Sequence, residues 1–405
     1  MAKENIYFTN DYRVLENGNS IIIGNIINGQ WFKCQKGAFD FLKDSMEQEL
    51  SIEEILEKCE DEYTKKYILK VIQLLEEVGA VSNDEVHKKI ENDIAATDVS
   101  LVLTNGCNLR CRHCVASCGD FKRQDLSFEK IKRVTQWCNK KKIKEITLTG
   151  GEIFIRKDIK EILQYIRENY KGKISVITNG TLISDTILDT LVRCVDQIDI
   201  SMDGYDDESV SKIRGNGVFD KVVDVIKRLH HKGFKAVSLS MVLTGENRKH
   251  VEEFKSLCAK YEVQELLRVL SPGGRAADNF DELKDIDFEK EETETSNVSE
   301  YTFKCVCQKL NSELSIDEKG NVYPCVLLQD RGKEIGTIED LEKGYLNQVT
   351  DKEPIVDMID GCKQCNVRYF CASNCVGLDL AIFNNAKAKQ MHCDKMKKIY
   401  DAVWN

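Results

Sequence analysis

The chain has 405 residues, 42% of them hydrophobic and 31% charged, and a formal net charge of −10 at pH 7. This length predicts two or three domains, and the negative charge argues against nucleic acid as a main partner. No apolar run approaches the roughly eighteen residues of a membrane span. The start, Met1 to Asn5, lacks the apolar core of a signal peptide, so we expect a cytoplasmic protein without membrane contact.

Residues 1–92 begin with short β-prone runs separated by turn residues, and three helical patterns follow. The dipeptide Asn-Gly at 28–29 is a strong hairpin signal. Ser51 and Glu54 have the spacing of a capping box, and residues 67–78 have the apolar period of an amphipathic helix. A small sheet followed by three helices is a winged-helix outline. DNA-binding domains and purely structural caps share this outline, but the acidic residues in these helices would repel phosphate.

A cysteine triplet comes directly after an apolar run, 99–104, that predicts a buried strand. Cys107, Cys111 and Cys114 have the spacing C-x3-C-x2-C. Such a set offers an iron–sulfur cluster three thiolates and leaves one iron free to bind another molecule. A cluster that only transfers electrons is held by four protein ligands. Zinc motifs usually pair two C-x2-C units, so zinc is the less favoured alternative.

Strand and helix patterns alternate after the triplet, which indicates parallel strands joined by crossover helices. The first helical pattern covers 127–142. The strand patterns lie at 145–149, 174–178, 197–201, 237–243 and 266–270. Polar residues and glycines follow several strands at their carboxyl ends, where sites lie in barrels of this kind. These residues are Gly150, Gly151, Glu152, Asn179, Ser201, Asp203 and Arg214.

With the triplet, these strand ends resemble the radical SAM family over residues 98–280. The resemblance implies an α/β protein with a partial (β/α)6 barrel over 96–280. It also implies that the triplet holds a 4Fe–4S cluster whose open iron binds S-adenosylmethionine. The reduced cluster would cleave that molecule to a 5′-deoxyadenosyl radical. The residues after the strand ends would contact the cofactor, and Arg214 would pair with its carboxylate.

A second cysteine array follows an acidic segment, 281–300, which the composition predicts to be a bridge between domains. Seventeen cysteines in a chain of this kind favour metal binding over disulfides. A zinc ribbon would need two C-x2-C pairs, and residues 301–405 contain one. The cysteines of this array are Cys305, Cys307, Cys325, Cys362, Cys365, Cys371, Cys375 and Cys393.

The spacing from Cys362 to Cys375 resembles the signature of the SPASM extension, and Gly320 to Cys325 resembles the hairpin that precedes it. The resemblance implies two auxiliary 4Fe–4S clusters in residues 301–405. The implied ligands of the outer cluster are Cys362, Cys365, Cys371 and Cys393. Those of the inner cluster are Cys307, Cys325 and Cys375, with either Cys305 or an open coordination position completing the set.

The three parts together resemble the radical SAM maturases of ribosomally made peptides, in which a domain like 1–92 recognises a leader. The resemblance implies a precursor peptide as substrate and flavodoxin or ferredoxin as electron donor. It favours a thioether from a cysteine sulfur to a carbon, as in sactipeptides. The alternatives are a carbon–carbon crosslink and formylglycine formation in sulfatases. Sulfatase maturases usually carry an Asp where Val326 stands. No residue is assigned as catalytic acid or base.

Overall fold

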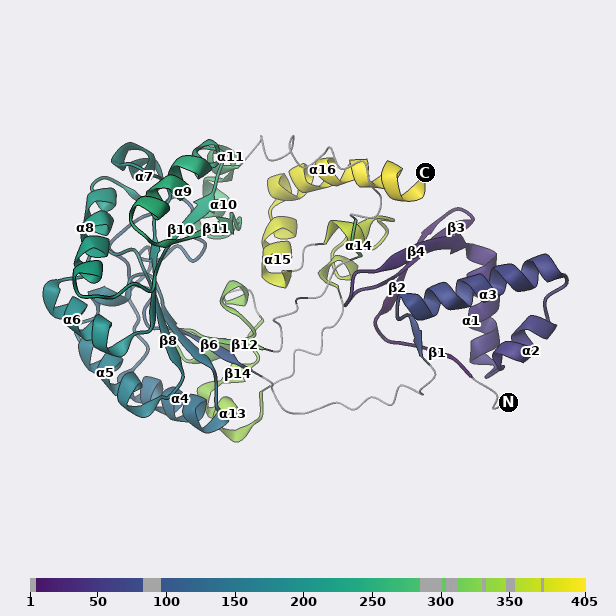
Figure 1. The fold of residues 1–405 in the computed structure, drawn as a ribbon, viewed down its shortest axis with the longest axis horizontal. Helices are drawn as coiled ribbons and strands as arrows, with labels where there is room; N and C mark the ends of the chain where they lie inside the picture. Colours follow the sequence, from purple (N-terminus) through teal and green to yellow (C-terminus); the bar gives the residue numbers. More distant parts are fainter. Residues whose placement is uncertain are drawn as a thin grey trace. The chain divides into compact units, whose positions relative to one another are not determined.

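The computed structural model divides into two compact units, coloured by sequence in Figure 1. The described residues are 5–82, 96–284, 301–303, 307, 312–329, 333–346, 354–372 and 375–405. One unit contains Met1–Asn92, Glu294–Gln308 and Asp351–Asn405, and the larger one contains Asp93–Thr293 and Lys309–Thr350. Among the described residues, no helix has both the length and the apolar composition needed to cross a bilayer.

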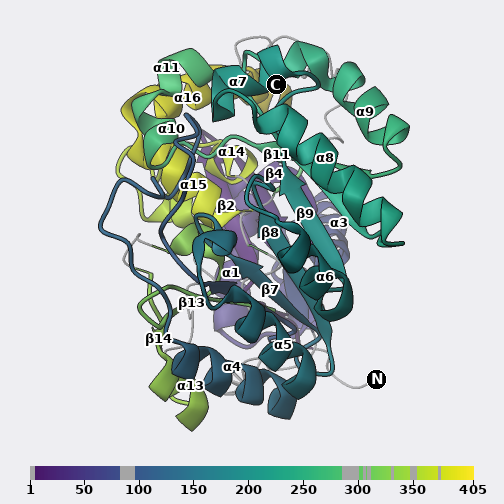
Figure 2. The same cartoon turned by 90° about the vertical axis from the view of Figure 1, so that its left-hand side faces the viewer.

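The larger unit is built on a sheet whose first six strands in chain order run parallel, each beside the next (Figure 2). These strands are β6 (Asp98–Val102), β7 (Glu145–Thr149), β8 (Lys173–Thr178), β9 (Gln197–Ser201), β10 (Val237–Leu243) and β11 (Gln264–Val269). Parallel neighbours need crossover connections, which the intervening helices supply. The predicted α/β class with parallel strands is therefore confirmed.

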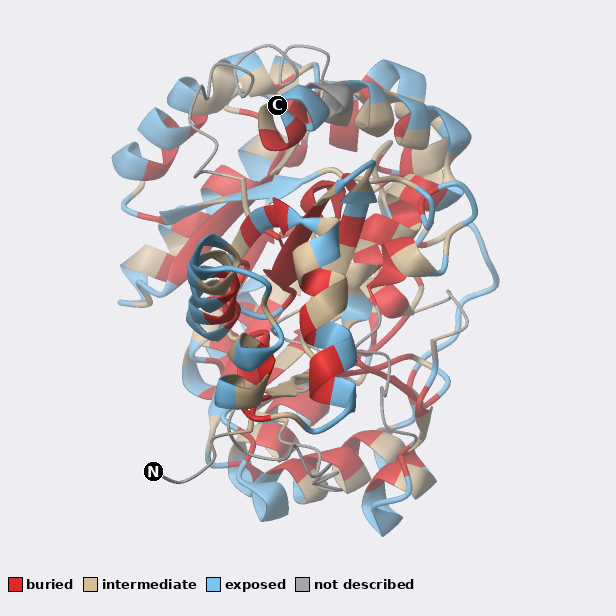
Figure 3. Cartoon of the chain, turned by 90° about the vertical axis from the view of Figure 1, so that its right-hand side faces the viewer, coloured by how far each residue is buried: buried red, intermediate tan, exposed pale blue. Residues whose placement is uncertain are grey.

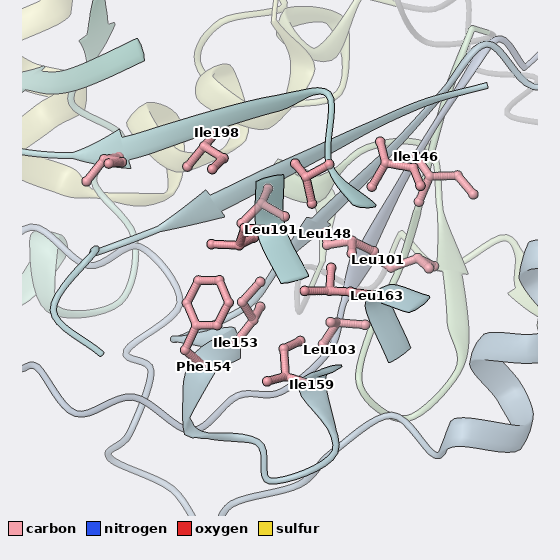
Figure 4. Packing of buried hydrophobic residues seen from close by; sticks show 14 of the residues in the cluster. Leu101, Leu103, Ile146, Leu148, Ile153, Phe154, Ile159, Leu163, Leu191 and Ile198 are labelled. Atoms are coloured by element: carbon pink, nitrogen blue, oxygen red, sulfur yellow. The ribbon is translucent and has the colours of Figure 1, made fainter. Parts of the chain in front are cut away.

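Helices cover the outer face of this sheet (Figures 1 and 2). They are α4 (Phe128–Lys141), α5 (Ile159–Asn169), α6 (Asp185–Cys194), α7 (Asp207–Arg214), α8 (Val218–His231) and α9 (Val251–Lys260). Side chains of a strand alternate between its two faces. Ile146, Leu148 and Ile198 therefore pack outward against helix residues such as Leu163 and Leu191 (Figure 4). The opposite face and the strand ends are left for polar groups.

A hairpin from the C-terminal third of the chain extends the same sheet. Its strands are β12 (Glu313–Ile316) and β13 (Asn321–Tyr323), followed by β14 (Gly336–Thr337) and α13 (Ile338–Lys343). Strand β12 pairs with β6 in parallel and with β13 in antiparallel register. The Asp317 carboxylate accepts the backbone N–H groups of Lys319 and Gly320 in the turn. Arg133 of α4 forms ion pairs with Glu339 and Glu342 of α13.

The smaller unit begins with an antiparallel sheet and three helices. The sheet contains β2 (Tyr12–Asn17), β3 (Ser20–Asn25) and β4 (Trp31–Gln35), and β1 (Tyr7–Phe8) pairs with β5 (Val81–Ser82). The helices are α1 (Lys36–Glu47), α2 (Ile52–Glu57) and α3 (Glu62–Glu77). The predicted hairpin at 28–29 and the capping box of Ser51 and Glu54 are both confirmed. Ile21 and Ile23 point toward the helices and form a core with them.

The other face of this sheet shares a second core with the C-terminal segment of the chain. That segment contains α14 (Arg368–Cys371), α15 (Val376–Asn384) and α16 (Ala386–Trp404). Leu15 and Ile22 of the sheet pack in one cluster with Phe303 and Phe370. The Trp31 indole N–H donates to the carbonyl of Tyr301 at 2.7 Å. Leu15 and Ile22 on this face and Ile21 and Ile23 on the other are buried, and Figure 3 colours the chain by burial.

Candidate functional site

The cysteine triplet lies in the loop after β6, and the backbone of this loop accepts hydrogen bonds from the turn after β7. The N–H of Gly151 donates to the Thr104 carbonyl at 2.8 Å, and the N–H of Glu152 donates to the Gly106 carbonyl at 2.9 Å. A Cβ on Gly151 would collide with that same Gly106 carbonyl. A residue without a side chain is therefore required where the two loops meet. The next residue after that carbonyl group is Cys107, so the turn lies against the first cysteine.

Glu152 links the ends of β7 and β8 through a fully buried carboxylate. Its oxygens accept the Thr178 hydroxyl at 2.8 and 2.9 Å, and one also accepts the Asn179 N–H at 2.8 Å. Burial raises the pKa of Glu152, and these hydrogen bonds oppose the shift. The side chain of Asn179 lies against the triplet loop. Its Nδ2 donates to Asn108 at 2.9 Å and is 3.9 Å from the sulfur of Cys107.

Three buried side chains form a network beside the second cysteine. One carboxylate oxygen of Asp203 lies 2.5 Å from Nε of Arg214 and 2.6 Å from Nε2 of His113. The other oxygen accepts the Val242 N–H at 2.7 Å. Arg214 also lies 3.7 Å from the sulfur of Cys111. Burial alone would raise the pKa of Asp203, but Arg214 and His113 hold it below its usual range.

From its place within the triplet, His113 is expected to pack near the cofactor rather than to act as an acid or base, and the structure pairs it with Asp203. Its position between Cys111 and Cys114 was the available signal, since a buried imidazole needs a polar partner. Arg214, expected beside a cofactor carboxylate, has Asp203 and Cys111 as its partners here. Ser201 is half-buried at the end of β9.

The sulfur of Cys114 differs from the other two in its electrostatics. Two hydrogen bonds from Cys118 lower the pKa of Cys114 to about 5. The larger effect comes from the Cys118 side chain, and the smaller one from its backbone N–H at 3.4 Å. Burial raises the pKa of Cys107 and of Cys111. The N–H of Leu109 also points at the sulfur of Cys107 at 3.4 Å. Donors aimed at sulfur stabilise thiolates and tune the metal groups they bind.

The cysteines of the outer set lie in the smaller unit, and three of them are near enough to Cys371 to affect its ionisation. Burial raises the pKa of Cys371, and the nearby Cys393, Cys365 and Cys362 raise it further. Within the inner set, burial raises the pKa of Cys375, and the nearby Cys307 also raises it. Cys325 lies in the larger unit, directly before a short 3-10 turn, Val326–Leu328. Cys305 lies outside the described residues.

The surroundings of the triplet sulfurs suit an iron–sulfur cluster. In the described part of the chain, no three His, Cys, Asp or Glu side chains converge as ligands of one ion. Thiolates of a 4Fe–4S cluster bind different irons, so they need not converge on one point. The three sulfurs share one loop, with N–H donors at Cys107 and Cys114 and a guanidinium at Cys111. That donor set suits a cluster of negative charge.

Residues 101–258 match the Radical SAM superfamily. The expected radical SAM domain is therefore confirmed for this part of the chain. The mycofactocin maturase MftC of Mycolicibacterium smegmatis is 32% identical over 183 residues, which are 45% of this chain and 46% of that protein. A probable GTP 3′,8-cyclase of Saccharolobus islandicus is 29% identical over 194 residues, or 47% and 63%. Each match thus spans less than two thirds of the relative, and the shared domain does not fix a substrate.

Solved structures share the fold over a longer part of the chain. SuiB of Streptococcus suis gives a TM-score of 0.52 at 15% identity, covering 91% of this chain and 95% of that one. A SuiB structure bound to the precursor peptide SuiA gives 0.51 at 14% identity, with coverage of 92% and 96%. The enzyme anSMEcpe with bound AdoMet gives 0.51 at 17% identity, with coverage of 76% and 97%. At these identities the likeness shows the fold.

Asp203→Asn is expected to destabilise the larger unit, because Arg214 would stay buried without its negative partner. Removing one member of a buried ion pair costs about 3–5 kcal/mol, and urea unfolding at pH 7 measures it. The control is Asp224→Asn, whose partner Arg228 lies on the surface of α8. An exposed pair contributes at most about 1 kcal/mol. Equal effects of the two substitutions would contradict the buried pair.

The same pair predicts a pH dependence. The pKa of Asp203 is lowered in the folded protein. Its stabilisation is therefore complete above the unfolded-state value of about 3.9 and is lost as the pH falls below it toward the folded-state pKa. The Asp203→Asn variant should lack this contribution to acid sensitivity.

Proposed function

We propose that this protein is a radical SAM peptide maturase that forms a thioether between a cysteine sulfur and a carbon of a ribosomally made precursor peptide. The observation that carries the proposal is the meeting of three strand ends at the triplet loop. The Gly151 turn, Asn179 and the pair of Asp203 and Arg214 all lie against that loop. The fold shared with SuiB, which has been solved with a precursor peptide, supports a peptide as substrate.

Cys107, Cys111 and Cys114 would hold the 4Fe–4S cluster, and the strand-end residues would bind S-adenosylmethionine. Bound there, the two groups would supply a 5′-deoxyadenosyl radical able to remove a hydrogen from an unactivated carbon. The chain's own part is to hold the triplet loop in a fixed position. Glu152, buried and held by Thr178 and Asn179, keeps the turn in place. The network of Asp203 fixes the opposite side of the loop.

The second cysteine array would hold two auxiliary 4Fe–4S clusters, which would accept the surplus electron. The nearness of Cys362, Cys365 and Cys393 to Cys371 supports a shared group there. The three-stranded sheet of the smaller unit would bind the leader. Its order, β2-β3-β4, leaves β2 and β4 as edge strands, and an extended peptide can add to such an edge through main-chain hydrogen bonds. A flavodoxin or ferredoxin would deliver electrons.

The experiment that tests this function incubates the protein with its own cysteine-bearing precursor peptide, S-adenosylmethionine and a strong reductant. The product should be lighter by two hydrogens per crosslink, one lost from sulfur and one from carbon. The cysteine used should resist alkylation. Mass spectrometry before and after alkylation measures both. A product with that mass loss and a freely alkylated cysteine would instead indicate a carbon–carbon crosslink, and formylglycine in a sulfatase peptide would change the substrate class.

A further inference from the structure

The segment after β11 returns to the triplet loop and binds its backbone. We name residues 272–284 the strap; it contains the short helices α10 (Arg275–Asp278) and α11 (Phe280–Leu283). The backbone N–H of Arg275 donates to the carbonyl of Cys114 at 3.0 Å. Its Nε donates to the carbonyl of Cys111 at 3.0 Å, and both terminal nitrogens lie 3.3 Å from the carbonyl of Cys118. One residue thus contacts the backbone of the loop at three points.

Other strap residues add to this attachment. The side-chain amide of Asn279 donates to the carbonyl of Arg112 at 3.2 Å, and Glu282 forms an ion pair with Arg112. Gly274 has a φ of 51°, and a Cβ there would lie 2.5 Å from the Val115 carbonyl oxygen. The strap therefore approaches the loop too closely to leave room for a side chain at position 274.

We propose that Arg275 is a positioning residue that fixes the cluster-binding loop and raises the reduction potential of the cluster held there. The inference rests on the proposed function, because it assumes a cluster on the triplet. The guanidinium side chain is only 15% exposed, so water screens its charge weakly. Asp120 pairs with it but also pairs with Arg110 at 3.1 Å, which leaves a net positive charge beside the loop.

Reduction adds one negative charge to a cluster, so a fixed cation nearby favours the reduced form. Hydrogen bonds and charge around the sulfurs are among the factors that set cluster potentials. The fork of Arg275 has a second effect, because it ties together the carbonyls of Cys111 and Cys118 on either side of Cys114. Substitution of Arg275 can remove the guanidinium hydrogen bonds while keeping the positive charge, so the two effects can be tested separately.

The experiment compares Arg275→Ala and Arg275→Lys after reconstitution without oxygen, by iron analysis and by redox titration of the EPR signal that changes with S-adenosylmethionine. Arg275→Ala should lose up to about four irons per chain, those of one cluster. In the cluster that remains, the ratio of reduced to oxidised form at a given potential should fall about tenfold, or about 59 mV. Arg275→Lys keeps the charge, so it should restore the potential but not the iron. The matched control is Arg228→Ala, which removes two ion pairs, with Asp185 and Asp224, and a contact with the Ile183 carbonyl, but no contact with the triplet cysteines.

A second pair of variants tests the close approach without changing any charge. Gly274→Ala should reduce iron retention, because its Cβ meets the loop. Gly233→Ala is the control, since Gly233 also has a positive φ, 80°, but has nothing within 4 Å of a Cβ. Normal iron and potential in Arg275→Ala, or equal iron loss in both glycine variants, would overturn the inference. Failure of the wild-type protein to take up any cluster would instead overturn the proposed function.

Discussion

Replacing Cys107, Cys111 and Cys114 together by Ala is expected to abolish all cleavage of S-adenosylmethionine and to remove about a third of the iron. On the proposed function the protein would carry three 4Fe–4S clusters, or about twelve irons, and the triplet would hold one of them. The three sulfurs lie in one loop against the Gly151 turn and the buried pair of Asp203 and Arg214. No other described thiols lie in that loop except Cys118.

The measurements are iron analysis after anaerobic reconstitution and chromatographic detection of 5′-deoxyadenosine. The control is Cys138→Ala together with Cys258→Ala, two buried cysteines on the helix side of the sheet. These should leave the iron content unchanged, since their thiols serve as small apolar groups. Stoichiometric zinc with little iron in the wild type would refute the cluster assignment.

Trp31→Ala is expected to destabilise the smaller unit by up to about 3 kcal/mol, the lower limit for removing a fully buried aromatic side chain, because Trp31 is half-buried and packs against the core. The Trp31 ring lies 5.0 Å from the ring of Phe370, edge to face, and its N–H donates to the carbonyl of Tyr301. Phe370 is next to Cys371 of the outer set. The substitution should therefore also reduce iron retention in the outer auxiliary cluster.

Thermal unfolding and iron content test this prediction, and Tyr63→Ala is the control. Tyr63 is an aromatic residue of α3 that is 82% exposed, so its loss should change stability by less than about 0.5 kcal/mol. Deleting residues 1–82 should lower stability and iron content more than Trp31→Ala does, because it exposes the whole core that the sheet shares with the C-terminal segment. A truncated protein that keeps its full iron content would show that the sheet and the C-terminal segment fold independently.

The sequence was sufficient for the features that depend on local chemistry. The triplet, the Gly-Gly-Glu turn and the capping box at Ser51 are short patterns whose residue types are dictated by ligation, backbone space or an open helix end. The parallel strands followed from apolar runs alternating with helical periods, because those periods record which side of each element is buried.

Contacts between distant segments were decided only by the tertiary structure. Nothing in residues 313–316 indicated that β12 would pair with β6, because an exposed sheet edge accepts any strand of suitable length. Likewise, the sequence predicted that Arg214 lies at the cofactor site but did not indicate that it would pair with Asp203 and lie beside Cys111. Periodicity shows that a side chain is buried but not which partner buries it.

The sequence by itself thus determined the radical SAM domain, its cysteines and the order of its strand ends. The tertiary structure decided that the N-terminal sheet shares a core with the C-terminal cysteine segment, and that Arg275 reaches back to the triplet loop. Residues 24 and 303 meet in that core, and residues 111 and 275 meet at that loop. Such long-range contacts depend on how entire faces of sheets and helices pack together, and no pattern within a single segment encodes them.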